Sequence, residues 1–380
     1  MIDKFRLIVT TSIFSLMIAS PTYSQSANLG SSISASGNVH FSPRPANVQH
    51  IDYEAWSDLL EVMVLSTGQS TRTSAPRATP NIGSRIILTH TSPYRLEGNK
   101  IAFSRFAPKF TALISDYRQE LEEVGNSINI EELSKNEQLA YWMNLHNVVI
   151  IEQIALAYPV VKPTALKVGP NKDPLHEAKI INIKGQALSL RDIREDIVYK
   201  NWNDSAVIYG FFLGDLGSPS IQNYAFNAEN VQTALDIIGY EYANSLRGFR
   251  QGRVSKVYSD VQAYFFPDFQ KDLRIHLRKY MRDEVAEELS RYDDLKDGRY
   301  PYRIADVVGG YDRGQGNAFQ SFDRDSTINP TVRNPAFDSF LNELREKYRK
   351  LNRLGLTNRG TVIIEDIETI VNDNEPHTGN

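Results

Sequence analysis

The pattern of apolar and polar positions is clearest between Ser134 and Pro159, where it predicts one long helix. Ser134 followed by Glu137 is a capping-box sequence, which starts a helix, and a proline disfavours helical geometry for the residue before it. Apolar side chains between these ends cover most of the circumference, which is typical of a helix buried on all sides. They are Leu139, Trp142, Met143, Leu145, Val148, Val149, Ile150, Ile151, Ile154 and Leu156. Glu137 and Glu152 argue against a membrane span, because a charge at bilayer depth costs several kcal/mol.

Three polar residues interrupt this apolar surface, namely Asn144, His146 and Asn147. Asn144 and Asn147 are three positions apart and therefore lie on one face of the predicted helix. Buried amides need hydrogen-bond partners. We therefore expect both asparagines to contact the backbone of a loop over 213–219, which is the favoured interpretation of their presence in a core helix.

Shorter elements are predicted on both sides of the central helix. Amphipathic helices are expected over 53–65, 103–117, 189–198, 228–246, 267–289 and 337–351, and short strands over 179–188, 253–257 and 303–308. The apolar run from Ala206 to Leu213 is typical of a strand buried on both faces. His276 flanks the apolar stripe of helix 267–289, so we expect it at the surface. This order of elements predicts an α+β fold, with the main domain over 50–320 and a C-terminal helix and polar tail over 321–380.

Composition excludes several classes of function. The 380 residues carry a net charge of −4 and a pI near 6.0, and no basic run stands out, which argues against broad nucleic-acid binding. Cysteine is absent, so disulfides, thiolate metal sites and a cysteine nucleophile are impossible. No Walker, dinucleotide-binding or HExxH sequence is present. We therefore predict no cofactor, no metal site and no nucleic-acid partner.

The first 24 residues have the pattern of a secretory signal peptide. Lys4 and Arg6 precede an apolar stretch from Leu7 to Ala19, and small residues near Ser24 suit signal peptidase. The apolar stretch is shorter than the roughly 20 residues needed to cross a bilayer, so secretion is favoured over a retained anchor. We expect cleavage near Ser24, a flexible leader over 25–48 and a periplasmic or secreted product.

Polar residues at the ends of buried elements are the candidates for function, because sites tend to be built there. A binding cleft is predicted from Asn144, Asn147, Gly214, Asp215, Tyr311 and Asp312. The candidates for catalysis are Ser218, His146 and Glu195. Each has a structural alternative, because a serine before a proline is usually a turn residue and Glu195 lies among charged neighbours typical of a solvated face.

Five segments resemble one known family. In chain order they are YWMNLHNVVII, GQALSLRDIREDIV, AVIYGFFLGDLGSPSIQNYAF, SKVYSDVQAYFFPDF and GGYDRGQGN. They are similar to the family named domain of unknown function 547. The resemblance runs over about 137–317, and the core of the predicted domain is expected over 134–317. The resemblance implies a papain-like or transglutaminase-like fold, with a buried central helix on a small sheet. It implies no established activity.

Members of that family tend to show W-x-N-L-Y-N in the helix, I-E-H after S-L, and a C-G-x-x-S-C-P loop. The positions that match are Trp142, Asn144, Leu145, Asn147, Ile193, Gly214 and Pro219. The positions that differ are His146 for the tyrosine, Arg194 and Glu195 for Glu-His, and Leu213 and Ser218 for the two cysteines. The resemblance therefore implies that the thiol and imidazole pair has been replaced.

Three functions follow as hypotheses. The leading one is a secreted binding or scaffold protein on a catalytically degenerate papain-like domain, with a peptide-like or cell-wall-derived ligand by analogy of fold alone. The second is a hydrolase or acyltransferase that uses Ser218 with His146 or Glu195 as base. The third is a structural protein that docks a partner through residues 335–355.

Overall fold

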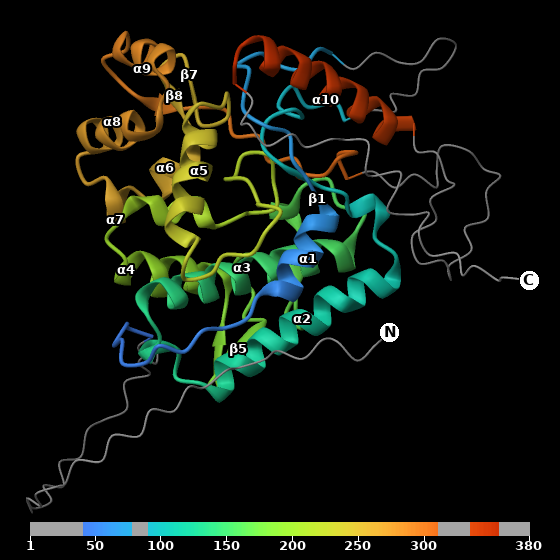
Figure 1. The fold of residues 1–380 in the computed structure, drawn as a ribbon, viewed down its shortest axis with the longest axis vertical. Coiled ribbons are helices and arrows are strands. Elements are labelled where there is room, and N and C mark those ends of the chain that lie inside the picture. Colours follow the sequence, from blue (N-terminus) through green and yellow to red (C-terminus); the bar gives the residue numbers. More distant parts are fainter. Residues whose placement is uncertain (1–40, 78–89, 311–334, 357–380) are drawn as a thin grey trace, which may run out of the picture.

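The computed structural model describes residues 41–77, 90–310 and 335–356 (Figure 1). The predicted signal peptide, most of the leader over 25–48, and the cleft candidates Tyr311 and Asp312 lie outside these residues.

Helix α3 (Lys135–Ala157) is the predicted central helix, and its bounds confirm the sequence prediction. The Ser134 hydroxyl accepts the Glu137 backbone N–H at 3.1 Å, as a capping box requires. Nearly all of its side chains from Glu137 to Ile154 are buried. Figure 1 shows α3 at the centre, with α2 (Pro108–Ser127) on one side and α5 (Val231–Ala243) on the other.

The N-terminal elements pack around this helix. Helix α1 (Glu54–Met63) is followed by the short helix η1 (Phe103–Arg105) and by α2. Pro108 is the first residue of α2, a position at which a backbone N–H would have no partner within the helix. The single turns η2 (Ile130–Glu132) and η3 (Pro163–Ala165) lie before and after α3.

The strands of the described ranges are short and form four small sheets. Antiparallel pairs join β1 (Val64–Leu65) to β2 (Lys100–Ile101), β3 (Lys167–Val168) to β4 (Asp173–Pro174), and β5 (Ile181–Ile183) to β6 (Gln186–Leu188). In the three-stranded sheet, β8 (Arg253–Val254) pairs with β7 (Phe249–Arg250) and, in parallel, with β9 (Lys296–Asp297). Helices with small sheets confirm the α+β class, and β5–β6 is the strand pair predicted over 179–188.

The predicted buried strand over 206–213 is wrong. Residues Ser205–Gly210 form a 3-10 helix, η5, and extended backbone begins only at Phe211. The run is buried as expected, but a short apolar run does not distinguish a strand from a buried helix. The Asp204 carboxylate, which accepts the Ala206 N–H at 2.9 Å, starts the helix at this point.

The single helix predicted over 267–289 is two helices, α8 (Phe269–Tyr280) and α9 (Asp283–Ser290). The Asn244 side chain satisfies the backbone at the break, since it donates to Tyr280 O at 2.9 Å and accepts Arg282 N–H at 2.8 Å. His276 is buried rather than exposed. Its ring nitrogens contact Ser205 Oγ and Tyr209 OH, each at 2.7 Å.

Two further strand predictions are wrong in part. Of the strand predicted over 253–257, only Arg253–Val254 is extended, and the helices α6 (Lys256–Asp260) and α7 (Gln262–Phe265) follow. The Ser255 side chain caps α6, which ends the strand early. Over 303–308 only isolated pairings form, between Ile304 and Asp215 and between Asp306 and Ile101.

Helix α10 (Pro335–Arg353) covers the early part of the chain (Figure 1). Phe337, Phe340 and Leu344 pack with Val307 and Val308 in a second hydrophobic cluster. The apolar face of α10 is therefore occupied by this chain itself.

Candidate functional site

The loop over 214–219 is built around the side chain of Asp215, which is 2% exposed. Its Oδ1 accepts the N–H groups of Gly217 and Ser218, both at 3.1 Å, and the hydroxyl of Tyr300 at 2.8 Å. Its Oδ2 is buried and has no hydrogen-bond partner among the described residues. The carboxyl group therefore both shapes the turn and retains one unused oxygen.

Burial raises the pKa of Asp215 to about 7, against the opposing effect of the Tyr300 hydroxyl and the two backbone N–H groups. A carboxyl with such a pKa exchanges its proton near neutral pH. Asp215 is therefore the one sequence-predicted cleft residue of the described chain whose carboxyl titrates in this range.

Ser218 acts as a turn residue. Its hydroxyl is buried and donates to the Asp215 backbone carbonyl at 2.8 Å. Its backbone N–H is held by the Asp215 carboxylate. The hydroxyl has no hydrogen bond to an imidazole or a carboxylate of the described residues, so the structure does not bring Ser218 together with either candidate base.

His146 is fully buried in α3 and contacts Arg194 instead. Its Nε2 lies 2.9 Å from Arg194 Nη1, and its Nδ1 lies 3.1 Å from Asn147 Oδ1. A guanidinium only donates, so Nε2 accepts and Nδ1 carries the proton. Burial and the Arg194 charge both hold the pKa of His146 well below its usual value. This imidazole is neutral, and its lone pair is already in use.

Arg194 also reaches His176, a residue that sequence analysis missed. Arg194 Nη1 lies 3.4 Å from His176 Nδ1 and 3.3 Å from Leu190 O. Burial and the Arg194 charge lower the pKa of His176 to about 3, although a hydrogen bond to the Leu213 backbone opposes the shift. His176 therefore contacts both Arg194 and the backbone of Leu213, two of the positions that depart from the family pattern.

The element that carries Arg194 is η4 (Asp192–Val198), a π-helical segment followed by the single turn α4 (Tyr199–Asn201). Its start is a reciprocal cap, since Asp192 N–H donates to Ser189 Oγ at 3.1 Å and Ser189 N–H to Asp192 Oδ2 at 2.6 Å. Glu195 lies on the outer side of this segment. It is half-exposed, and its Oε1 lies 3.7 Å from Arg191 Nε.

Asn144 and Asn147 hold backbone, but not that of the predicted loop. Asn144 donates to Phe226 O at 2.7 Å and accepts Phe226 N–H at 3.1 Å. Asn147 donates to Gly210 O at 3.0 Å and accepts Phe212 N–H at 3.1 Å. The predicted partner, loop 213–219, is therefore wrong. Helix η5 ends at Gly210, and the backbone at Gly210 and Phe212, just before the predicted loop, is the part that meets Asn147.

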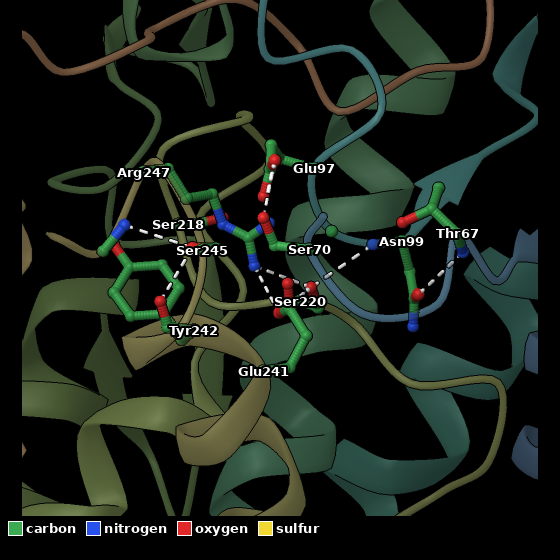
Figure 2. Close-up of polar contacts among 12 residues, drawn as sticks. Thr67, Ser70, Glu97, Asn99, Ser218, Ser220, Glu241, Tyr242, Ser245 and Arg247 are labelled. Atoms are coloured by element: carbon green, nitrogen blue, oxygen red, sulfur yellow. Dashed lines mark hydrogen bonds and ion pairs between the residues drawn. The ribbon is translucent and has the colours of Figure 1, made fainter. Parts of the chain in front are cut away.

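A buried polar network that was not predicted lies beside the loop (Figure 2). Arg247, which is 5% exposed, donates from Nη2 to Ser220 Oγ at 2.9 Å and also pairs with Glu241. The Ser220 hydroxyl donates to Glu241 Oε2 at 2.9 Å and accepts Asn99 N–H at 3.3 Å. Arg247 Nε is buried without a partner among the described residues. One buried guanidinium therefore keeps an unused donor.

Arg247 also lines a cavity of about 220 Å³, which we call the arginine pocket. Its lining is Tyr94, Leu246, Arg247, Arg250, Gln251, Arg253, Val254, Ser255, Gly298, Arg299 and Tyr300. Among the described residues, four guanidinium groups and no carboxylate line it. Sequence analysis missed this pocket, although the spacing of three in RGFRQGR was a usable signal.

In the part of the chain that the structure describes, no cluster of three or more histidine, aspartate or glutamate side chains has the geometry to bind a metal ion. Within the same ranges, every helix is too short or too polar to cross a bilayer.

Comparison with known proteins identifies the segment that contains α3, η4 and the 214–219 loop. Residues 130–242 match the family described as protein of unknown function, DUF547. This segment is similar to the DUF547 family. The resemblance found in the sequence is confirmed over these residues. The arginine pocket lies outside the matched segment, because Tyr94 precedes it and the other lining residues follow it. No curated protein and no solved structure matches the chain.

Proposed function

We propose that this protein is a binding protein on a catalytically degenerate, papain-like DUF547 domain. The observation that carries the proposal is the separation of the three candidate catalytic groups. Ser218 donates to a backbone carbonyl, His146 accepts from Arg194, and Glu195 pairs with Arg191 at the surface. A serine nucleophile needs a base within about 3 Å, and each of the two candidate bases has another partner.

The electrostatics of His146 support the same proposal. To activate Ser218, the imidazole would have to release Arg194 and accept a proton next to a guanidinium. Burial and that guanidinium already hold the pKa of His146 well below its usual value. A general base is most effective when its pKa lies near the working pH. His146 is therefore unsuited to act as a general base for Ser218.

Secretion is part of the proposal and rests on the N-terminal sequence. A basic start, an apolar stretch from Leu7 to Ala19 and small residues near Ser24 suit signal peptidase. N-terminal sequencing of protein isolated from its native compartment should give a chain that begins near Gln25. An intact Met1 would contradict export.

A serine-directed fluorophosphonate probe tests the absence of turnover. The folded parent protein should remain unlabelled, and Ser218→Ala should bind any ligand as the parent does, because the hydroxyl only closes a turn. Ser259, whose hydroxyl also donates to a backbone carbonyl at 3.0 Å, offers a matched control through Ser259→Ala. Stoichiometric labelling of Ser218 that His146→Ala abolishes would replace this proposal with a serine hydrolase or acyltransferase.

A further inference from the structure

The arginine pocket is built on a hairpin whose turn fixes the position of two guanidinium groups. Strands β7 and β8 are joined by Gln251 and Gly252, with φ of 52° and 72°. Positive φ at both positions is the geometry of a type I′ turn, which closes a two-residue hairpin. Arg250 and Arg253 are therefore directly paired across the hairpin, and their side chains share one face.

This arrangement places like charges in register. Arg250 pairs with Arg253 across β7 and β8, and Arg253 pairs with Lys296 across β8 and β9. Like charges directly opposite one another destabilise a sheet. Arg299 follows three residues after Lys296 and lines the same cavity. A row of this kind costs stability unless a negative charge lies against it.

The described protein supplies little of that negative charge. Arg253 donates to the Asp297 backbone carbonyl at 3.0 Å, and neither Arg250 nor Arg299 forms an ion pair or side-chain hydrogen bond with a described residue. Arg247 is the exception, since Glu241 pairs with it. Even there, the buried Nε lacks a partner.

We propose that the arginine pocket binds a small anion with at least two negative charges, a phosphate ester or a polycarboxylate. Guanidinium groups present a planar fork of donors that matches both groups in two-point contacts. The volume of about 220 Å³ is roughly seven times the ~30 Å³ that a water molecule occupies in the liquid, so the pocket takes a small ligand or the charged end of a larger one. Tyr94 and Tyr300 add aromatic walls.

This inference names the ligand class of the proposed binding function and rests on it. It also assigns a place for the ligand outside the DUF547 segment. Tyr300 connects the two regions, because it lines the pocket and its hydroxyl donates to Asp215 in the 214–219 loop.

Isothermal titration calorimetry of the full chain with inorganic phosphate, pyrophosphate and citrate, at one ionic strength set by chloride, tests the proposal. Arg250→Gln and Arg299→Gln should each weaken binding by about tenfold or more, because each removes charge-assisted hydrogen bonds. Both side chains are exposed and form no ion pair or side-chain hydrogen bond with a described residue, so the variants should fold. Arg278→Gln, which removes the same charge from the exposed surface of α8, should bind as the parent does.

The anions that give a binding heat in calorimetry decide between a phosphate ester and a polycarboxylate as the ligand. Saturable binding of phosphate or pyrophosphate alone assigns a phosphate ester, and binding of citrate alone assigns a polycarboxylate. No heat with any of the three anions at millimolar concentration would overturn the proposal. Equal affinity in Arg250→Gln, Arg299→Gln and Arg278→Gln would overturn it as well. Serine-probe labelling reports on the proposed function separately, because it does not depend on the anion.

Discussion

The replacement Asp215→Asn should change how the stability of this protein depends on pH. The carboxyl is buried, and its pKa is raised to about 7, whereas an aspartate in an unfolded chain has a pKa of about 3.9. Because the folded protein holds this proton more tightly, the contribution of Asp215 to stability is fully present below about pH 4 and is lost as pH rises through about 7.

The difference between the folded and unfolded pKa values corresponds to a loss of about 4 kcal/mol in the free energy of unfolding as pH rises. About 3 kcal/mol of this loss falls between pH 5 and pH 8. An asparagine keeps an acceptor for Gly217, Ser218 and Tyr300 but has no proton to lose. The free energy of unfolding of Asp215→Asn relative to the parent should therefore rise by about 3 kcal/mol from pH 5 to pH 8.

Urea unfolding at a series of pH values measures this difference. Burial also lowers the pKa values of His146, His176 and His276, which makes stability fall as pH drops below about 6.5. That opposite slope is common to parent and variant and cancels in the comparison. Asp58→Asn, which removes a carboxylate from the exposed side of α1, should run parallel to the parent. A parallel curve for Asp215→Asn would refute the reasoning.

Two further changes test the packing that surrounds the site. Asn147→Leu should lower the free energy of unfolding by about 1–3 kcal/mol, because Gly210 O and Phe212 N–H lose a buried partner; a urea midpoint equal to that of the parent would contradict this. Leu344→Ala should lower the free energy of unfolding by about 2–5 kcal/mol, because Leu344 lies on the inner face of α10 and is fully buried. The half-exposed Leu354 provides a control, since Leu354→Ala should change the free energy of unfolding by less than about 0.5 kcal/mol.

Elements with marked ends were predictable from the sequence. Helix α3 is one, because Ser134 begins it and the residue before Pro159 ends it. The β5–β6 hairpin is another, because Lys184 and Gly185 adopt φ of 51° and 76° between two alternating strands. In both cases the information that fixes the element lies within the element itself.

Elements fixed by distant residues were not predictable. The break between α8 and α9 is held by Asn244, which lies 38 positions before Arg282. The helix over 205–210 has no periodicity of its own that separates it from a strand. His276 is buried because Ser205 and Tyr209 offer hydrogen bonds to both ring nitrogens. Such partners are visible only once the chain is folded.

The candidate site was predictable as a loop but not as an electrostatic environment. Asp215 and Ser218 lie in one turn of the expected loop, their predicted roles in binding and catalysis stay predictions, and the arginine pocket was not predicted. The 42 basic and 46 acidic residues give a small net charge for the whole chain. An average of this kind hides a local excess, and the excess here forms only when the 247–253 hairpin and residue 299 come together.

The position of α10 sets the time at which this fold can be completed. Arg95 is buried and makes a two-point ion pair with Glu343, at 2.6 and 2.8 Å, from a position 248 residues earlier. Lys347 likewise donates to Leu96 O at 2.6 Å. At about 5–20 residues per second, a ribosome needs on the order of 10–50 s to cover that separation. During this interval Arg95 and Leu96 lack the partners that α10 supplies in the folded protein.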